Sequence, residues 1–125
     1  MNITDSVISL NVPDPLASAK FLIDHLGFEE KMSADGFVSL GRSDAGLNVV
    51  YLRTGLASFK PKSVAGSAGE GLLVAFVVDD IDAEYARLQG EGVPIVTPIE
   101  TEEWGERYFQ MSDPNGIIIQ LVQWV

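Results

Sequence analysis

The chain has 125 residues and a mass of 13.5 kDa, a length that suits one domain. Its 8 basic and 18 acidic residues give a net charge of −10, and 46% of the residues are hydrophobic. Nucleic-acid binders need basic side chains to release counterions, and anionic membranes repel acidic chains, so we expect neither partner. The absence of cysteine excludes disulfides, thiol nucleophiles and cysteine-ligated zinc.

The compartment we expect is the cytoplasm. The N-terminus lacks the basic segment followed by an apolar one that is typical of a signal peptide. No apolar run approaches the ~20 residues that span a bilayer. The acidity is uneven: residues 1–62 carry six basic and seven acidic residues, a net of −1, whereas residues 63–125 carry two and eleven, a net of −9. Such a field favours solubility, and it can also attract a cationic ligand.

The first half predicts one strand, one helix and three further strands. Residues 6–12 alternate between apolar and polar positions, which is typical of a strand. Asp14 and Pro15 suit the N-cap and first turn of a helix over 16–26, and Gly27 suits its C-cap. Turn residues separate three short strands that we expect over 28–32, 36–41 and 47–53.

The same order returns in the second half. After a Gly- and Ser-rich loop over 55–70, we expect strands over 71–78, 93–96, 107–111 and 117–124, with a helix over 81–89. Val12-x-Asp14 and Val78-x-Asp80 each end a strand and open a helix, 66 residues apart. An internal repeat of this size predicts an α+β fold of two βαβββ modules, over residues 5–54 and 71–125 of a single domain.

These segments resemble the vicinal oxygen chelate superfamily, which includes glyoxalase I, extradiol dioxygenases and bleomycin-resistance proteins. The segments that carry the resemblance are Val12-Pro13-Asp14, His25-Leu26-Gly27-Phe28, Val78-Asp79-Asp80-Ile81-Asp82-Ala83, Trp104-Gly105-Glu106-Arg107 and Asp113-Pro114-Asn115-Gly116. The resemblance implies a cup-shaped mixed sheet with the helices outside and a ligand cavity inside. It also implies a homodimer, since members are often dimers.

Enzymes of that superfamily usually hold a divalent metal with His, Glu or Gln. Counting from the motifs carries the four ligand positions to Val7, a residue within two of Val49, Leu73 and Gln120. Only Gln120 has a donor atom, because Val and Leu cannot coordinate a metal. The sequence therefore predicts no metal and no cofactor, and it resembles the metal-free bleomycin-resistance branch.

The remaining candidate ligands have structural explanations. His25, the only histidine, lies near the end of the first predicted helix, where a solvated cation interacts favourably with the helix dipole. Asp79, Asp80 and Asp82 stand where the second helix needs a cap. No nucleophile elbow, phosphate-binding loop or histidine near the cavity supports catalysis, so we predict no catalytic residue.

Strand parity predicts which side chains line the cup. One parity gives a mostly apolar lining with a few polar groups: Val7, Ser9, Asn11, Val49, Tyr51, Arg53, Leu73, Ala75, Val77, Ile118, Gln120, Val122 and Trp124. The other parity is apolar and is expected to pack against the helices: Ile8, Leu10, Val12, Val74, Phe76, Ile117, Ile119 and Leu121.

Trp104 is the most informative residue of the candidate site. It stands in an acidic stretch, 100–106, that we expect to be irregular. An indole among carboxylates can stack on a planar ring or face a cation. The alternative is that it closes one end of the cup, with the glutamates solvated.

We therefore predict a metal-free small-molecule-binding protein that sequesters a planar or cationic antibiotic-like ligand, and so serves antibiotic resistance. The candidate ligand-binding residues are Asn11, Phe37, Tyr51, Phe59, Glu102, Glu103, Trp104, Glu106 and Gln120. The roles are stacking for Trp104, attraction for the three glutamates, and polar anchoring for Gln120, Tyr51 and Asn11. The alternatives are a lyase or oxygenase of the same superfamily with non-standard metal ligands, and a subunit or sensor module without a small ligand.

Overall fold

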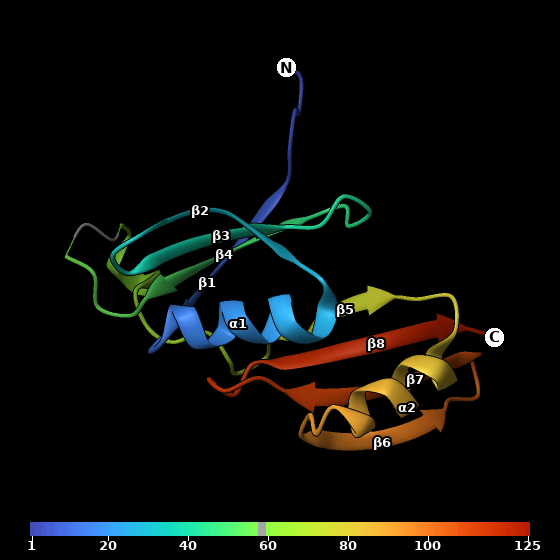
Figure 1. Ribbon diagram of the computed structural model, residues 1–125. Coiled ribbons are helices and arrows are strands. Elements are labelled where there is room, and N and C mark those ends of the chain that lie inside the picture. The colour runs from blue at the N-terminus through green and yellow to red at the C-terminus, as the bar shows by residue number, and fades with distance from the viewer. Residues whose placement is uncertain (58–59) are drawn as a thin grey trace. The chain divides into compact units, whose positions relative to one another are not determined.

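The computed structural model describes residues 1–57 and 60–125 and divides them into two compact units, Met1–Ala68 and Gly69–Val125 (Figure 1). Each unit has the element order βαβββ and one four-stranded mixed sheet with one α-helix packed on it. The strand order β1-β4-β3-β2 of the first sheet recurs as β5-β8-β7-β6 in the second. This repeated topology confirms the predicted α+β fold class.

The first unit contains the predicted helix and four strands. In both sheets the first and last strands of the unit pair in parallel and the other neighbours pair antiparallel. The elements are β1 (Val7–Val12), α1 (Pro15–Leu26), β2 (Glu29–Ala34), β3 (Phe37–Gly41), β4 (Asn48–Arg53) and a short 3₁₀ helix, η1 (Lys62–Val64).

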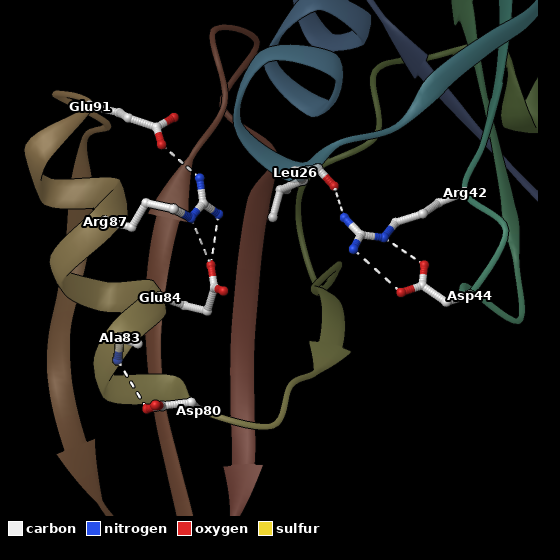
Figure 2. A network of polar contacts seen from close by, with 8 residues as sticks. All are labelled: Leu26, Arg42, Asp44, Asp80, Ala83, Glu84, Arg87 and Glu91. Atoms are coloured by element: carbon white, nitrogen blue, oxygen red, sulfur yellow. Dashed lines mark hydrogen bonds and ion pairs between the residues drawn. The ribbon is translucent and has the colours of Figure 1, made fainter.

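Both ends of α1 are fixed by the residues that the sequence indicates. Asp14 accepts a hydrogen bond from the backbone N–H of Ala17 at 3.3 Å, and Gly27 ends the helix with φ of 69°. Arg42, which is also paired with Asp44, donates to the carbonyl oxygen of Leu26 (Figure 2). A Cβ on Gly27 would come within 2.9 Å of the Arg42 guanidinium, so glycine here serves both backbone conformation and space.

The core of the first unit lies between α1 and one face of its sheet. The pairing of Ile8 with Val49 and of Leu10 with Tyr51 sets the register, since directly paired residues share a face. The predicted parity is confirmed for β1 and wrong for β4, because Val49 and Tyr51 share the face of Leu10 and not that of Asn11. The buried residues of this face are Leu10, Val12, Val38, Leu40, Val49 and Tyr51.

The second unit repeats the arrangement. Its core includes residues that alternate along β5 and β8, as predicted: Val74, Ile119 and Leu121. The elements are β5 (Val74–Val77), α2 (Ile81–Gly90), β6 (Ile95–Thr101), β7 (Glu106–Ser112) and β8 (Ile118–Trp124).

Polar contacts cap α2, stabilise it internally and connect it to its sheet. Asp80 accepts a hydrogen bond from the backbone N–H of Ala83 at 3.1 Å, which confirms it as the N-cap (Figure 2). Within the helix, Arg87 pairs with Glu84 and Glu91, each at 2.7 Å. Asp82 lies in the first turn of α2, beside the cap as predicted, and it also binds Arg107 of β7 at 2.7 Å.

Strand β6 differs from the prediction. The sequence predicts a strand over 93–96 that Pro98 ends, yet β6 continues to Thr101. Proline is tolerated because β6 lies at the edge of its sheet, where one side of the backbone has no strand partner. The register with β7 shifts between Thr97 and Glu100, on either side of that proline.

In the described residues, no helix is long and apolar enough to cross a membrane.

Candidate functional site

The face of the second sheet that α2 leaves free carries a concentration of polar and aromatic side chains. Phe109 packs edge-on against Tyr85 of α2, with ring centroids 4.9 Å apart, which identifies the helix-covered face. The residues on either side of Phe109 in β7 therefore project to the opposite, helix-free face. These are Glu106, Tyr108, Gln110 and Ser112, with Ile118, Gln120, Val122 and Trp124 beside them on β8.

A chain of hydrogen bonds crosses this face from β6 to the β6–β7 turn. The Thr97 hydroxyl donates to Oε1 of Gln110 at 2.7 Å, and Nε2 of Gln110 donates to Oε1 of Gln120 at 2.8 Å. Nε2 of Gln120 then donates to Oε1 of Glu106 at 3.1 Å. The other carboxylate oxygen of Glu106 accepts the indole N–H of Trp104 at 2.9 Å. Trp104 and Gln120 are thus held by the two oxygens of one carboxylate.

Tyr108 forms a second polar group on the same face. Its phenolic oxygen lies 2.5 Å from Oε1 of Glu100 and 2.8 Å from Oε1 of Glu102. The hydrogen bonds to Glu100 and then Glu102 raise the pKa of Tyr108 well above its ordinary value, because they stabilise the protonated phenol. The hydroxyl has one hydrogen to share between the two acceptors, so the cluster has spare capacity for a donor.

Trp104 is exposed although its N–H is bonded. Its relative exposure is 68%, and it lies in the short turn between β6 and β7, closed by a hydrogen bond from Gly105 N–H to the carbonyl of Glu102. Gly105 has φ of 88°, and a Cβ there would lie 2.7 Å from the carbonyl oxygen of Val125. The predicted irregular stretch 100–106 is too long, since β6 runs to Thr101 and β7 begins at Glu106, which leaves 102–105 as a tight turn that presents one indole ring to solvent.

The positions to which the superfamily's metal ligands carry over do not fit a metal. Ala75 pairs with Gln120 on the second sheet, and Ser9, which is 66 residues before Ala75, pairs with Val50 on the first. The internal repeat therefore assigns the uncertain second position to Val50. With Val7 and Leu73, three of the four positions are aliphatic and offer no donor. Within residues 1–57 and 60–125, no three His, Cys, Asp or Glu side chains are grouped as a metal site requires.

Two candidates of the first unit lie on its helix-free face. The pairing of Asn11 with Leu52, and of Leu52 with Phe37, places the three side chains in one row across the sheet. Asn11 is buried, and its side-chain amide donates to the backbone carbonyl of Val64. The backbone carbonyl of Asn11 accepts from the backbone N–H of Ala68. The role visible for Asn11 is therefore to hold the loop after β4.

Of the other predicted ligand-binding residues, some lie at this site and some do not. Tyr51 is buried on the helix-covered face, so the sheet does not present it to a ligand on the helix-free side. Glu102 and Glu106 join the polar groups described above, and Glu103 is exposed in the same turn. Phe59 lies outside the described residues.

Sequence reasoning missed four members of the site: Thr97, Glu100, Tyr108 and Gln110. The signal for two of them was available, because Tyr108 and Gln110 alternate along the predicted strand over 107–111. Thr97 and Glu100 were hidden by Pro98, which falsely indicated the end of a strand.

The chain belongs to a known family. Residues 6–121 match the model of the glyoxalase/bleomycin resistance protein/dioxygenase superfamily, which confirms the resemblance stated from the sequence motifs. The curated relatives include an uncharacterized protein of Mycobacterium bovis, which is 34% identical over 59 residues, or 47% of this chain. The match covers 37% of that relative, so the chain spans little more than a third of its length.

Solved structures show the same fold. A glyoxalase/bleomycin resistance protein/dioxygenase from Nocardioides has a TM-score of 0.81 at 21% identity, covering 100% of this chain and 85% of its own. A lactoylglutathione lyase from Agrobacterium tumefaciens has a TM-score of 0.78 at 18% identity, covering 98% and 94%. TnmS3, an antibiotic-binding protein from Streptomyces sp. CB03234, has a TM-score of 0.76 at 26% identity, covering 100% and 99%.

Proposed function

We propose that this protein binds a planar, cationic small molecule without using a metal, and that it acts by sequestering an antibiotic-like compound. The observation that carries the proposal is the arrangement around Trp104. The indole is 68% exposed, its N–H is held by Glu106, and the exposed Glu103 precedes it in the same turn. A ring fixed by its N–H presents its π face to solvent in a defined orientation.

Charge favours a cationic guest. Glu102 and Glu103 stand directly before Trp104, and the second unit supplies most of the net negative charge. A cation over an indole is attracted to the ring quadrupole, and nearby carboxylates add to that attraction. A planar aromatic amine combines both preferences in one molecule.

Two further observations support binding without metal chemistry. The positions Val7, Val50 and Leu73 have no donor atoms, whereas an enzyme of this superfamily needs ligands there. The similarity to TnmS3, described as an antibiotic-binding protein, at 26% identity over the whole chain is consistent with sequestration.

A thermal-shift screen of planar amines tests the proposal, because a ligand that binds only the folded state raises the melting temperature. Trp104→Ala should weaken the affinity for any hit about tenfold, the loss expected for one stacking and cation–π contact. Trp104→Phe keeps a ring and should retain part of the affinity. Equal affinity of the alanine variant, or no planar amine that stabilises the native protein, contradicts the proposal.

We also propose a cytoplasmic homodimer. A chain without cysteine is suited to a reducing compartment. Leu73 directly precedes β5 and Val77 is its last residue. Their side chains are 45% and 64% exposed, as expected of apolar side chains that a second copy covers. Sedimentation at micromolar concentration should give twice the mass of the chain, and a monomer would contradict the dimer.

A further inference from the structure

The hydrogen-bond chain on the helix-free face of the second sheet has a direction that one of its two ends decides. A carboxylate only accepts hydrogen bonds, so Gln120 must turn Nε2, and not Oε1, toward Glu106. Oε1 of Gln120 is then left for Gln110, which must offer its own Nε2. Oε1 of Gln110 in turn faces Thr97, whose hydroxyl donates. One charged end thus orients two neutral amides.

The opposite end permits either direction. A threonine hydroxyl both donates and accepts, so Thr97 could end the chain in reverse with no lost bond. Reversal is prevented only at Glu106, which already accepts from Trp104 and Gln120 with its two oxygens. Hydrogen bonds to a charged group are stronger than neutral ones, so the chain takes its direction from the carboxylate.

We propose that Glu106 is a positioning residue that sets the hydrogen-bond polarity of this face, so that Gln120 presents its amide nitrogen beside Trp104 and selects ligands with a hydrogen-bond acceptor. The choice of ligand class rests on the proposed function. The amide nitrogen has a second N–H beyond the one given to Glu106. Gln120 is only 6% exposed, so water competes little for that N–H, and a ring carbonyl of a guest stacked on Trp104 satisfies it where a methylene does not. The protein therefore prefers a planar amine with a ring ketone.

Exchanging the acceptor at position 106 for a donor tests the direction without any ligand. Through-hydrogen-bond scalar couplings in labelled protein connect each donor nitrogen to its acceptor carbon. The native protein should show coupling from Nε2 of Gln110 to Cδ of Gln120. Glu106→Lys should replace it with coupling from Nε2 of Gln120 to Cδ of Gln110. Glu70→Lys, the same charge change at an exposed position outside the site, should keep the native coupling.

The reverse coupling in the native protein overturns the proposal, and so does an unchanged coupling in a folded Glu106→Lys variant. The measurement on the native protein alone decides the direction if that variant does not fold.

A matched pair of probes tests the consequence for binding. An aminomethyl-fluorenone and the corresponding aminomethyl-fluorene differ only by a ketone in place of a methylene. The native protein should bind the fluorenone about fivefold more tightly, the worth of one net hydrogen bond. Glu106→Lys should lose this preference, and Glu70→Lys should keep it. Equal affinity of the native protein for both probes contradicts the selection while leaving the proposed function intact. Binding of neither probe, with the predicted couplings present, contradicts the ketone preference, whereas the proposed function is contradicted only if no planar amine of the screen binds.

Discussion

Tyr108 shows how two carboxylates control one side chain. Its hydroxyl lies within hydrogen-bonding distance of Glu100 and Glu102, and both interactions favour the protonated phenol. The phenol therefore stays neutral through the physiological range and keeps a hydrogen between two negative groups. The shared phenol hydrogen lies between two carboxylates, one on an edge strand and one in the turn that follows it.

The pH dependence of Tyr108 follows from the direction of its shift. Because the folded-state pKa is raised above the ordinary value of 10.0, the stabilisation from these hydrogen bonds is fully present below pH 10.0. It is lost as the pH rises through the folded-state pKa. The ultraviolet titration of native protein minus that of Tyr108→Phe should show one tyrosine ionising later than an unperturbed phenol. Glu100→Gln should move this transition to lower pH, whereas Glu103→Gln should leave it in place.

Asn11 shows why a polar residue predicted to contact a ligand can serve the chain instead. Its amide donates to the carbonyl of Val64 in the loop, and nothing in the alternation of β1 distinguishes that partner from a ligand. Partners 53 residues away are a property of the folded chain. Asn11→Ala should leave that loop carbonyl without its donor and lower the free energy of unfolding by about 1 to 3 kcal/mol, measured in urea. Ser9→Ala on the same strand is the control, and an equal effect of both changes would contradict the assignment.

The caps of α1 and α2 are the parts of the elements that the sequence predicts best. Asp14 and Asp80 each accept from the backbone three residues later, because a short acceptor is needed where helix N–H groups have no partner. Such signals are local, so they are readable without the fold. The repeat of these caps 66 residues apart is also what made the two-module organisation visible.

Removing the cap of α2 gives an element-scale prediction. Asp80→Ala should lower the free energy of unfolding by about 1 kcal/mol, since the N–H of Ala83 loses its acceptor. Asp79→Ala removes the same charge from the preceding exposed position and should change stability by less than about 0.5 kcal/mol. Urea unfolding followed by circular dichroism measures both. Equal destabilisation by the two changes would show that charge, and not capping, is responsible.

The elements that sequence reasoning misplaced lack such local signals. Strand β4 reads Asn48-Val49-Val50-Tyr51-Leu52-Arg53, which is apolar on both faces, so alternation cannot tell which residues face α1. Its pairing with β1 decides the register, and that information is non-local. The sequence predicts too short a strand for β6, because a proline such as Pro98 ends a central strand but not an edge strand. Which strand lies at the edge follows from the sheet topology. The same limits left the second ligand position uncertain near Val49 and hid Thr97 from the site.

For the whole molecule, the net charge of −10 has a consequence for binding. Exposed charges attract a cation over about a Debye length, which falls from about 30 Å at 0.01 M salt to about 8 Å at 0.15 M. The affinity for an aminomethyl-fluorene should therefore weaken severalfold across that range of salt. The neutral hydroxymethyl-fluorene, titrated by the same fluorescence method, should show little change. An equal salt response of the two probes would mean that the acidic surface does not take part.

We propose that this member of the superfamily holds its ligand without a metal. Calorimetric titration of chelator-treated protein with a planar amine identified in the screen, before and after addition of Zn²⁺ or Mn²⁺, tests this most directly. We predict the same affinity in all three states, because Val7, Val50 and Leu73 offer a metal no donors. Binding that appears only after stoichiometric uptake of metal would contradict the account.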